Sequence, residues 1–368
     1  MQVGFLCDDV TRRTGTGTYA VELVPRLQAL GVGCKVFCSA TRAGRHEPGA
    51  PAPRAVLTSW SNGYRKPLRA RRDARAVGRE IAEADVVHAL VEPYAPLAER
   101  LRTRRRRTVI TAHGTYAVAP FHHWYQRRLY GPAFRNAARV VGVSRYTAGA
   151  VERVVGADTS VIYSGVSVGR FQVDDAARAA EPLVVCVGAI KPRKGQIVLV
   201  RAFAEVHATV PGARLALVGA VHNAGYAERL RAVVSESGLG EAVSFEGEVS
   251  DEALARWYAR AWVFALTPVN VEWHFEGFGL VYIEAGACGV PSVATSGNGG
   301  EEAVLDGETG LVVPQHDVGA TAEAVTRLLS DDALRGRMGA AARRRAEALT
   351  WDRTAEQYAA LYDEVVRG

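Results

Sequence analysis

The sequence contains no run of 18 or more apolar residues, although 48% of its 368 residues are hydrophobic. A helix needs a run of about that length to cross a bilayer, so we expect no transmembrane segment. The apolar start, Met1 to Cys7, has no basic residue and leads directly into Asp8 and Asp9, which is unlike a signal peptide. With a charged fraction of 23%, these absences predict a globular, cytoplasmic protein of two domains.

Cysteine is also scarce, and its spacing excludes the usual cysteine-based sites. No two cysteines form a Cys-x-x-Cys pair, which argues against a zinc site or a disulfide framework. We interpret them as small buried hydrophobic residues in a reducing compartment: Cys7, Cys34, Cys38, Cys186 and Cys288.

Acidic residues are under-represented in the first half of the chain. Residues 1–172 hold 27 Lys and Arg against 12 Asp and Glu, whereas the remainder holds 18 against 27. Basic residues cluster at Arg65–Arg79 and Arg100–Arg107. Such clusters suggest an anionic partner, which could be a membrane surface, a charged acceptor or nucleic acid, and each cluster alone could equally be a solvated face.

Short β-branched runs alternate with amphipathic, helix-length segments along the whole chain. This order is typical of βαβ units whose parallel strands are buried on both faces. We predict an α/β protein with two Rossmann-like domains, residues 1–168 and 169–350, and a C-terminal helix over 351–368 that packs back on the first domain. A single long helix is expected at 318–349. The predicted strands are Val3–Asp8, Cys34–Ser39, Val86–Leu90, Thr108–His113, Val140–Ser144 and Ser160–Ser164, then Leu183–Gly188, Leu215–Gly219, Val243–Glu246, Val263–Leu266, Ser292–Thr295 and Gly310–Val313.

Ligands of open α/β sheets bind beyond the carboxyl ends of the strands, so the loops there are the candidate sites. The segment from His274 to Pro291 reads His-Phe-Glu-Gly-Phe-Gly-Leu-Val-Tyr-Ile-Glu-Ala-Gly-Ala-Cys-Gly-Val-Pro. Glu276 precedes a Gly-Phe-Gly turn, and Glu284 lies eight residues later in the following helix. Such a helix start can bind anions, and ionised carboxylates can grip sugar hydroxyls.

This segment resembles the Glu-Gly-Phe-Gly-Leu…Glu-Ala…Cys-Gly-Val-Pro signature of retaining glycosyltransferase family 4, whose GT-B fold has two Rossmann-like domains facing across a cleft. The likeness continues through Ser296–Glu302 and Asp306–Pro314. The resemblance implies that Glu284 binds the ribose of a nucleotide-sugar donor and that Glu276 lies beside the transferred sugar as a catalytic residue. It implies that the turn amides of Phe278, Gly279 and Leu280 meet the sugar and the diphosphate.

A basic segment, Lys-Pro-Arg-Lys-Gly, follows the strand Leu183–Gly188. The adjacent cations Arg193 and Lys194 suit a diphosphate leaving group, because they offset the charge that develops on it. Lys194 matches the phosphate-binding lysine of the family. Ala189 departs from the arginine that many members carry, and Arg193 is expected to take over its role.

The remaining candidate site residues lie in the first domain. The loop Arg13–Tyr19 resembles the family's Gly-Gly-x-Gly-x-Tyr loop, with Thr14 replacing the first glycine, and implies donor contacts at Gly15 and Gly17. An NAD site fits less well, because the third glycine of the dinucleotide motif is absent. His113 ends a strand and is expected to contact the donor sugar as a catalytic residue. Possible donor or acceptor contacts are Ser144 and Arg145. His88 also matches a frequent family position but is interpreted as a core histidine.

The sequence therefore predicts a retaining hexosyltransferase that uses a UDP- or GDP-sugar, in polysaccharide, glycolipid or related biosynthesis. No cofactor is expected, and no Asp-x-Asp motif near the site indicates a metal. The acceptor, a lipid-linked glycan or a small molecule, is not identified. Two alternatives stay open: a nucleotide-sugar 2-epimerase of the same fold, or a basic protein that binds a surface without transfer activity. We expect peripheral binding to an anionic inner membrane face, and no nucleic-acid partner.

Overall fold

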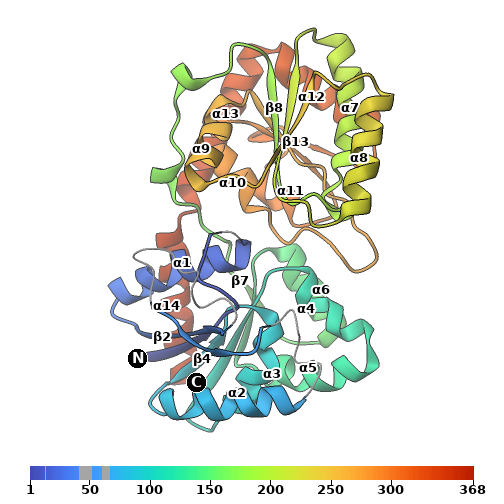
Figure 1. The fold of residues 1–368 in the computed structure, drawn as a ribbon. Coiled ribbons are helices and arrows are strands. Elements are labelled where there is room, and N and C mark those ends of the chain that lie inside the picture. Colours follow the sequence, from blue (N-terminus) through green and yellow to red (C-terminus); the bar gives the residue numbers. More distant parts are fainter. Residues whose placement is uncertain (13, 41–51, 60–66) are drawn as a thin grey trace. The chain divides into compact units, whose positions relative to one another are not determined.

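Two separate parallel sheets organise the chain in the computed structural model, which describes residues 1–12, 14–40, 52–59 and 67–368. The sheets belong to two units, which are Met1–Gly165 with Trp351–Gly368, and Val166–Thr350. Each unit is a sheet covered by helices on both faces (Figure 1). The domain boundary expected from the sequence lies between residues 168 and 169, with residues 351–368 assigned to the first domain.

The first unit has a seven-stranded parallel sheet in the order β3-β2-β1-β4-β5-β6-β7. The chain runs outward from β1 to one edge and then returns to β4 on the other side of β1. The strands are β1 Gln2–Leu6, β2 Gly33–Ser39, β3 Arg54–Leu57, β4 Val86–Ala89, β5 Arg107–Ala112, β6 Arg139–Gly142 and β7 Thr159–Val161. The helices are α1 Gly15–Ala29, α2 Pro67–Glu80, α3 Ala95–Leu101, α4 Thr115–Val118, α5 Trp124–Asn136, α6 Arg145–Val155 and α14 Trp351–Arg367, with 3₁₀ turns η2 Glu92–Tyr94 and η3 Ala119–His122.

The second unit repeats this winding with six parallel strands in the order β10-β9-β8-β11-β12-β13. The strands are β8 Leu183–Val187, β9 Arg214–Val218, β10 Val243–Gly247, β11 Val263–Ala265, β12 Ser292–Thr295 and β13 Gly310–Val313. The helices are α7 Gln196–Thr209, α8 Ala224–Glu236, α9 Asp251–Arg260, α10 Leu280–Ala287, α11 Gly300–Ala303, α12 Val318–Ser330 and α13 Asp332–Ala348, with 3₁₀ turns η4 Val168–Arg170, η5 Asp175–Ala177 and η6 Pro192–Lys194.

The central strands are buried because their sequences are almost entirely apolar. Every residue of β4, β8, β11 and β12 is buried, as is expected of parallel strands with helices on both faces. None of the helices that the structure describes is long and apolar enough to cross a bilayer. The winding order places a switch point between β1 and β4 in the first unit and between β8 and β11 in the second. Loops at the carboxyl ends of these strand pairs are the expected ligand sites.

Two features differ from the sequence prediction. Strand β3 was not predicted, since it has four residues at a sheet edge and half of them are exposed. The prediction of a single helix over 318–349 was wrong, because the structure has two helices, α12 and α13, separated at Asp331. The Asp331 side chain accepts a hydrogen bond from the amide of Leu334 at 2.8 Å, so it caps a new helix instead of continuing the old one.

The C-terminal helix α14 is anchored in the first unit by a buried polar network. His88, on β4, lies between the Tyr362 hydroxyl at 2.6 Å and the Thr111 hydroxyl at 2.7 Å. The Tyr358 hydroxyl also contacts Thr111, at 2.7 Å. Because burial lowers the pKa of His88 to about 3, the ring is neutral at pH 7. His88 is therefore a hydrogen-bonded core histidine, as the sequence interpretation held.

Candidate functional site

A buried cluster of ionised side chains lies in the two loops that follow β8 and β11. Lys194 follows β8 and Glu276 follows β11, and the Lys194 ammonium lies 2.5 Å from Glu276 Oε2. Arg193 Nη1 donates to the same oxygen at 2.8 Å and to the Phe275 carbonyl at 3.3 Å. Glu276 is 8% exposed and Lys194 is 9% exposed, so both charges are largely removed from water. The structure thus joins side chains from two loops that are far apart in the sequence.

The two cations keep Glu276 ionised. Burial alone would raise the pKa of this carboxyl, but Lys194 and Arg193 outweigh it and lower the pKa to about 2. Burial also lowers the pKa of Lys194, and the Glu276 carboxylate opposes that shift. Removing one member of such a pair leaves an uncompensated buried charge, which typically costs about 3–5 kcal/mol.

The start of helix α10 lies next to this cluster. Gly279 caps the helix in the left-handed conformation, with φ of 81°, and a Cβ there would lie 2.6 Å from the Tyr282 ring. Glycine is therefore needed for both its backbone conformation and its lack of a side chain. Within the described residues, the amides of Gly279 and Leu280 have no acceptor. The positive end of the helix is thus left open toward an anion.

A second glycine-rich loop, Ser296–Glu302, packs against the segment that carries Glu276. The amide of Gly299 donates to the Glu276 carbonyl at 2.8 Å, and a Cβ on Gly299 would lie 1.9 Å from the Gly277 carbonyl oxygen. Asn298, which is fully buried, caps the next turn by accepting from Gly300 at 2.8 Å. The motif Ser296–Glu302 therefore fixes the backbone that carries Glu276.

Glu284 lies on α10, the helix that follows the loop carrying Glu276. Its Oε2 accepts a hydrogen bond from the Tyr258 hydroxyl at 2.8 Å. Tyr258 is fully buried on α9, and burial together with the Glu284 carboxylate raises its pKa well above the usual value, so the phenol stays protonated and donates. Sequence reasoning missed Tyr258, because only the packing of α9 against α10 brings it to Glu284.

In the first unit, the two glycines that follow β1 have different surroundings. Gly17 is enclosed, since its amide donates to Thr14 Oγ1 at 3.0 Å and a Cβ would lie 2.0 Å from Asp9 Oδ1. Gly15 is the first residue of α1, and a Cβ added there would meet no atom within 4 Å. Thr14 replaces a glycine without strain because its backbone is extended, with φ of −130°. Arg13 lies outside the described residues.

His113 is held in place by the loop that follows β4. Its Nε2 lies 2.6 Å from the Leu90 carbonyl, and since a carbonyl only accepts, Nε2 carries the hydrogen and Nδ1 has the lone pair. Its backbone amide donates to Glu92 Oε1 at 2.5 Å. Burial lowers the pKa of His113 to about 4, so the ring is neutral at pH 7. Tyr19 packs edge-on against the ring at a centroid distance of 4.7 Å.

Glu92 is a further residue that sequence reasoning missed. It is fully buried, and its Oε2 has no hydrogen-bond partner in the part of the chain that the structure describes. Burial raises its pKa to about 7, while backbone amides including those of His113 and Gly114 oppose the rise. No sequence pattern indicates the contact between Glu92 and the His113 amide, because the two residues lie on loops after different strands.

Ser144 and Arg145 mark the start of α6. The Ser144 hydroxyl accepts from the amide of Thr147 at 3.0 Å and is fully buried, so it caps the helix. Arg145 is exposed on the first residue of the helix. Gly15, Gly17, His113, Ser144 and Arg145 thus share the carboxyl edge of the first sheet, whereas the structure groups the other predicted site residues in the second unit.

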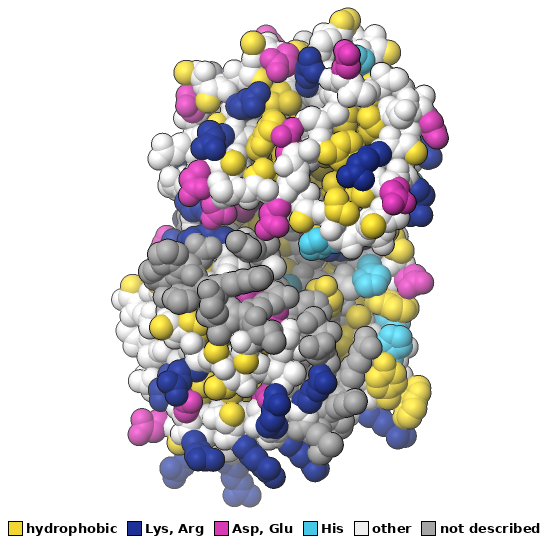
Figure 2. Space-filling model, in the orientation of Figure 1, with side chains coloured by type: hydrophobic (Ala, Val, Ile, Leu, Met, Phe, Trp, Pro, Cys, Tyr) yellow, Lys and Arg dark blue, Asp and Glu magenta, His cyan; other side chains and the backbone are white. Residues whose placement is uncertain are grey.

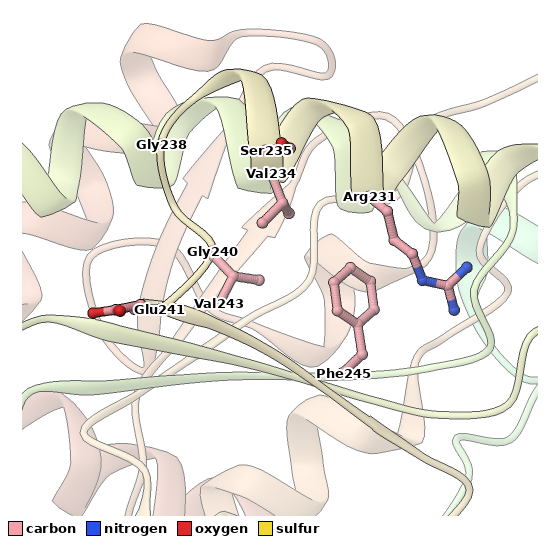
Figure 3. A pocket seen from close by; sticks show the side chains of 8 residues that line it. All are labelled: Arg231, Val234, Ser235, Gly238, Gly240, Glu241, Val243 and Phe245. Atoms are coloured by element: carbon pink, nitrogen blue, oxygen red, sulfur yellow. The ribbon is translucent and has the colours of Figure 1, made fainter.

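A hollow of about 450 Å³ lies elsewhere on the second unit, between α8 and the edge strand β10 (Figure 3). Its lining includes Arg231 and Val234 of α8 and Phe245 of β10. The Arg231 guanidinium lies over the Phe245 ring, 5.4 Å from its centroid. None of the predicted site residues lines this hollow, so it is separate from the candidate site.

Two family models match nearly the whole chain. Residues 13–170 match the model described as Glycosyltransferase Family 4, and residues 171–345 match the model described as Glycosyl transferases group 1. Among curated relatives, a GDP-mannose-dependent alpha-(1-6)-phosphatidylinositol monomannoside mannosyltransferase of Mycolicibacterium smegmatis is 36% identical, over 73% of this chain and 74% of its own. A D-inositol 3-phosphate glycosyltransferase of a Nocardioides species is 30% identical, over 95% and 84%.

Solved structures have the same arrangement of elements. A sucrose-phosphate synthase from Thermosynechococcus elongatus superposes with a TM-score of 0.83 at 25% identity, covering 99% of each chain. The Anabaena protein Alr3699/HepE, solved in complex with UDP-glucose, superposes with a TM-score of 0.81 at 21% identity, covering 99% of this chain and 100% of that one. At this identity the second likeness shows the fold alone.

The contrast between the two glycines predicts opposite effects of the same substitution. Gly17→Ala forces a Cβ into Asp9 and Thr11, which we expect to destabilise the protein by about 1–3 kcal/mol. Gly15→Ala meets no atom and removes backbone entropy from the unfolded chain, so its effect is within about 1 kcal/mol and in the stabilising direction. Urea unfolding of both variants measures this, and equal destabilisation would contradict the geometry.

The buried carboxyl of Glu92 predicts a pH-dependent stability difference. Because its folded pKa of about 7 exceeds the unfolded value, the neutral form is favoured on folding, and this contribution is lost as pH rises toward and past 7. We expect the stability of Glu92→Gln relative to wild type to increase between about pH 4.5 and pH 8, by at most about 3 kcal/mol. Melting temperatures over this range measure it, and a difference that does not change with pH would refute it.

Proposed function

The chain belongs to glycosyltransferase family 4 and has its GT-B fold, and from this premise we propose that it is a retaining hexosyltransferase that uses a UDP- or GDP-sugar. The observation that carries the proposal is the ion cluster of Arg193, Lys194 and Glu276 beside the open start of α10. Both lie at the switch point of the second sheet, where open α/β sheets bind ligands. Cations and free amides together suit the diphosphate of a donor.

The reaction breaks the bond between the anomeric carbon of the donor sugar and the diphosphate oxygen. A bond from the acceptor oxygen to the same carbon forms on the same face, and the acceptor proton passes to the departing phosphate oxygen. The negative charge grows on the diphosphate, so the groups that lower the barrier are those that face it. In this proposal these are Lys194, Arg193 and the amides of Gly279 and Leu280, with Glu276 beside the sugar.

We propose two distinct roles for the other predicted residues. Glu284, oriented by Tyr258, accepts hydrogen bonds from the ribose hydroxyls of the donor. His113 contacts the donor sugar through Nδ1, the ring nitrogen that the Leu90 carbonyl leaves with a lone pair. Glu284 belongs to the second unit and His113 to the first.

The first donor to test is GDP-mannose, since the relative at 36% identity is named for that donor. The first acceptors to test contain inositol. One relative is named for a phosphatidylinositol monomannoside and another for D-inositol 3-phosphate. Both are polyols attached to a phosphate, and the exposed Arg145 at the carboxyl edge of the first sheet is a suitable partner for that phosphate. The proposed product is a glycolipid or related glycoconjugate.

Donor binding predicts specific losses on substitution in the second unit. Losing a charged hydrogen bond to phosphate or ribose costs about 1.5–3 kcal/mol, so we expect Lys194→Ala and Glu284→Ala to weaken GDP binding at least about tenfold. Tyr258→Phe keeps the Glu284 carboxylate but removes the hydrogen bond that orients it, so a smaller loss of GDP affinity, about threefold, is expected. Isothermal titration with GDP and UDP measures these affinities, and transfer from GDP-mannose is followed with and without EDTA.

The matched control is Arg327→Ala, which removes an exposed cation near the end of α12 in the same unit. This variant should bind GDP like wild type, and all variants should be shown to be folded by thermal melting. Wild-type affinity in both Lys194→Ala and Glu284→Ala would refute the donor site. Activity that EDTA abolishes and metal restores would refute the proposal that protein cations alone stabilise the leaving group.

We also propose that the first unit binds an anionic membrane surface that carries the acceptor. Within the described residues, six exposed arginines on α2, on α3 and in the loop after α3 have no ion-pair partner: Arg71, Arg75, Arg79, Arg100, Arg104 and Arg105. The sequence between Glu99 and Glu152 contains no acidic residue. Lys and Arg side chains gather over α2 at the end of this unit (Figure 2). Arg65 of the predicted cluster lies outside the described residues.

Spacing makes this surface testable. Arg71, Arg75 and Arg79 recur every four residues and so share one face of α2. Each contributes about 1 kcal/mol near an anionic bilayer, so replacing all three with Gln should weaken binding to phosphatidylglycerol vesicles at least tenfold. The control replaces three exposed arginines of the second unit, Arg201, Arg337 and Arg344. Co-sedimentation at low and high salt measures binding, and equal binding to neutral vesicles would refute the proposal.

A further inference from the structure

One cation of the loop that follows β8, Lys191, is not part of the ion cluster of Arg193, Lys194 and Glu276. Lys191 precedes η6 with an extended backbone, φ −162° and ψ 158°, and its side chain is partly exposed. Arg193 and Lys194 both bind Glu276, whereas the Lys191 ammonium has no ion pair or hydrogen bond with any residue that the structure describes. The loop therefore carries a cation whose counter-charge is not supplied by the residues that the structure describes.

The surroundings of Lys191 are unfavourable for its charge. Burial of part of the side chain lowers its pKa to about 8, Arg193 and Lys194 contribute to that shift, and Glu276 opposes them. His274, on the facing loop, also lies within electrostatic reach of Lys191 and has a lowered pKa. Three cations thus lie near a single carboxylate, so this loop carries surplus positive charge.

We propose that Lys191 is a third donor-binding cation, whose ammonium binds the diphosphate of the nucleotide sugar. This inference rests on the proposed function, because it assigns a further contact at the same site. Arg193 offers only part of its guanidinium to the diphosphate, since its Nη1 is committed to Glu276 and to the Phe275 carbonyl. In this proposal, a diphosphate bound at the start of α10 supplies negative charge to this loop.

The proposal predicts that binding depends on the charge of Lys191. A bound diphosphate stabilises the ammonium, so binding takes up a proton as the pH approaches and passes 8. Affinity for GDP should therefore fall between about pH 7.5 and pH 9.5, although its phosphates are already fully ionised. Lys191→Arg keeps its charge over this range and should bind GDP with little change. Burial also lowers the pKa of Lys194, and a decline in Lys191→Arg as steep as that in wild type would overturn the dependence on Lys191.

The experiment is a titration of the full chain with GDP, UDP and GMP. Lys191→Ala should weaken GDP and UDP binding at least about tenfold at about pH 7.5 and weaken GMP binding less, because the lost contact is to the diphosphate. Lys191→Arg should restore affinity for GDP. Arg327→Ala serves as the control for loss of a cation, and thermal melting without nucleotide shows that each variant is folded.

The outcomes separate this inference from the proposed function. If wild type binds neither GDP nor UDP, both are overturned together. If Lys194→Ala and Glu284→Ala weaken binding but Lys191→Ala binds as wild type does, the donor site stands and the role of Lys191 is overturned. Equal losses for GDP and GMP in Lys191→Ala would also overturn it, since they would indicate a general effect on the unit.

Discussion

The candidate site depends on one buried ion cluster, in which Glu276 pairs with both Lys194 and Arg193. Burying a charge without a partner is costly, so the loops after β8 and β11 can meet only if the cations of one compensate the carboxylate of the other. The tight contact of Gly299 with Gly277 then positions the backbone around Glu276. The open start of α10 is a consequence of this packing, because Gly279 turns the chain immediately after the cluster.

Most of the fold could be predicted from the sequence because the central strands are continuous apolar runs, which are easily recognised as buried strands. The prediction was incomplete or wrong in two places: at a sheet edge, and where a local polar contact ends a helix. Strand β3 has too few buried residues to show a pattern, and Asp331 ends one helix and starts the next in a stretch where the helical periodicity continues. Comparison with known proteins supports the family and the GT-B fold that the motifs implied.

Partner residues were much less predictable than motif residues. Glu276, Glu284 and Lys194 stand in recognisable segments, but Tyr258 and Glu92 do not, since each meets its partner only through tertiary packing. Gly17 shows a related limit. Its place in a glycine-rich loop suggested a ligand contact, whereas the structure shows that Asp9 and Thr11 occupy the space beside it. A motif therefore identifies a loop without distinguishing its ligand-facing residues from those that shape it.

Glu276 and Glu92 show that partners, more than burial, determine the charge of a carboxyl group in this protein. Both are buried, yet the pKa of Glu276 is lowered to about 2 and that of Glu92 is raised to about 7. Two cations contact Glu276, while the partners of Glu92 among the described residues are backbone amides. An anionic donor can approach an ionised Glu276 only because the cations around it outnumber it. The surplus positive charge of the loop after β8 is therefore as much a requirement of the site as the carboxylate itself.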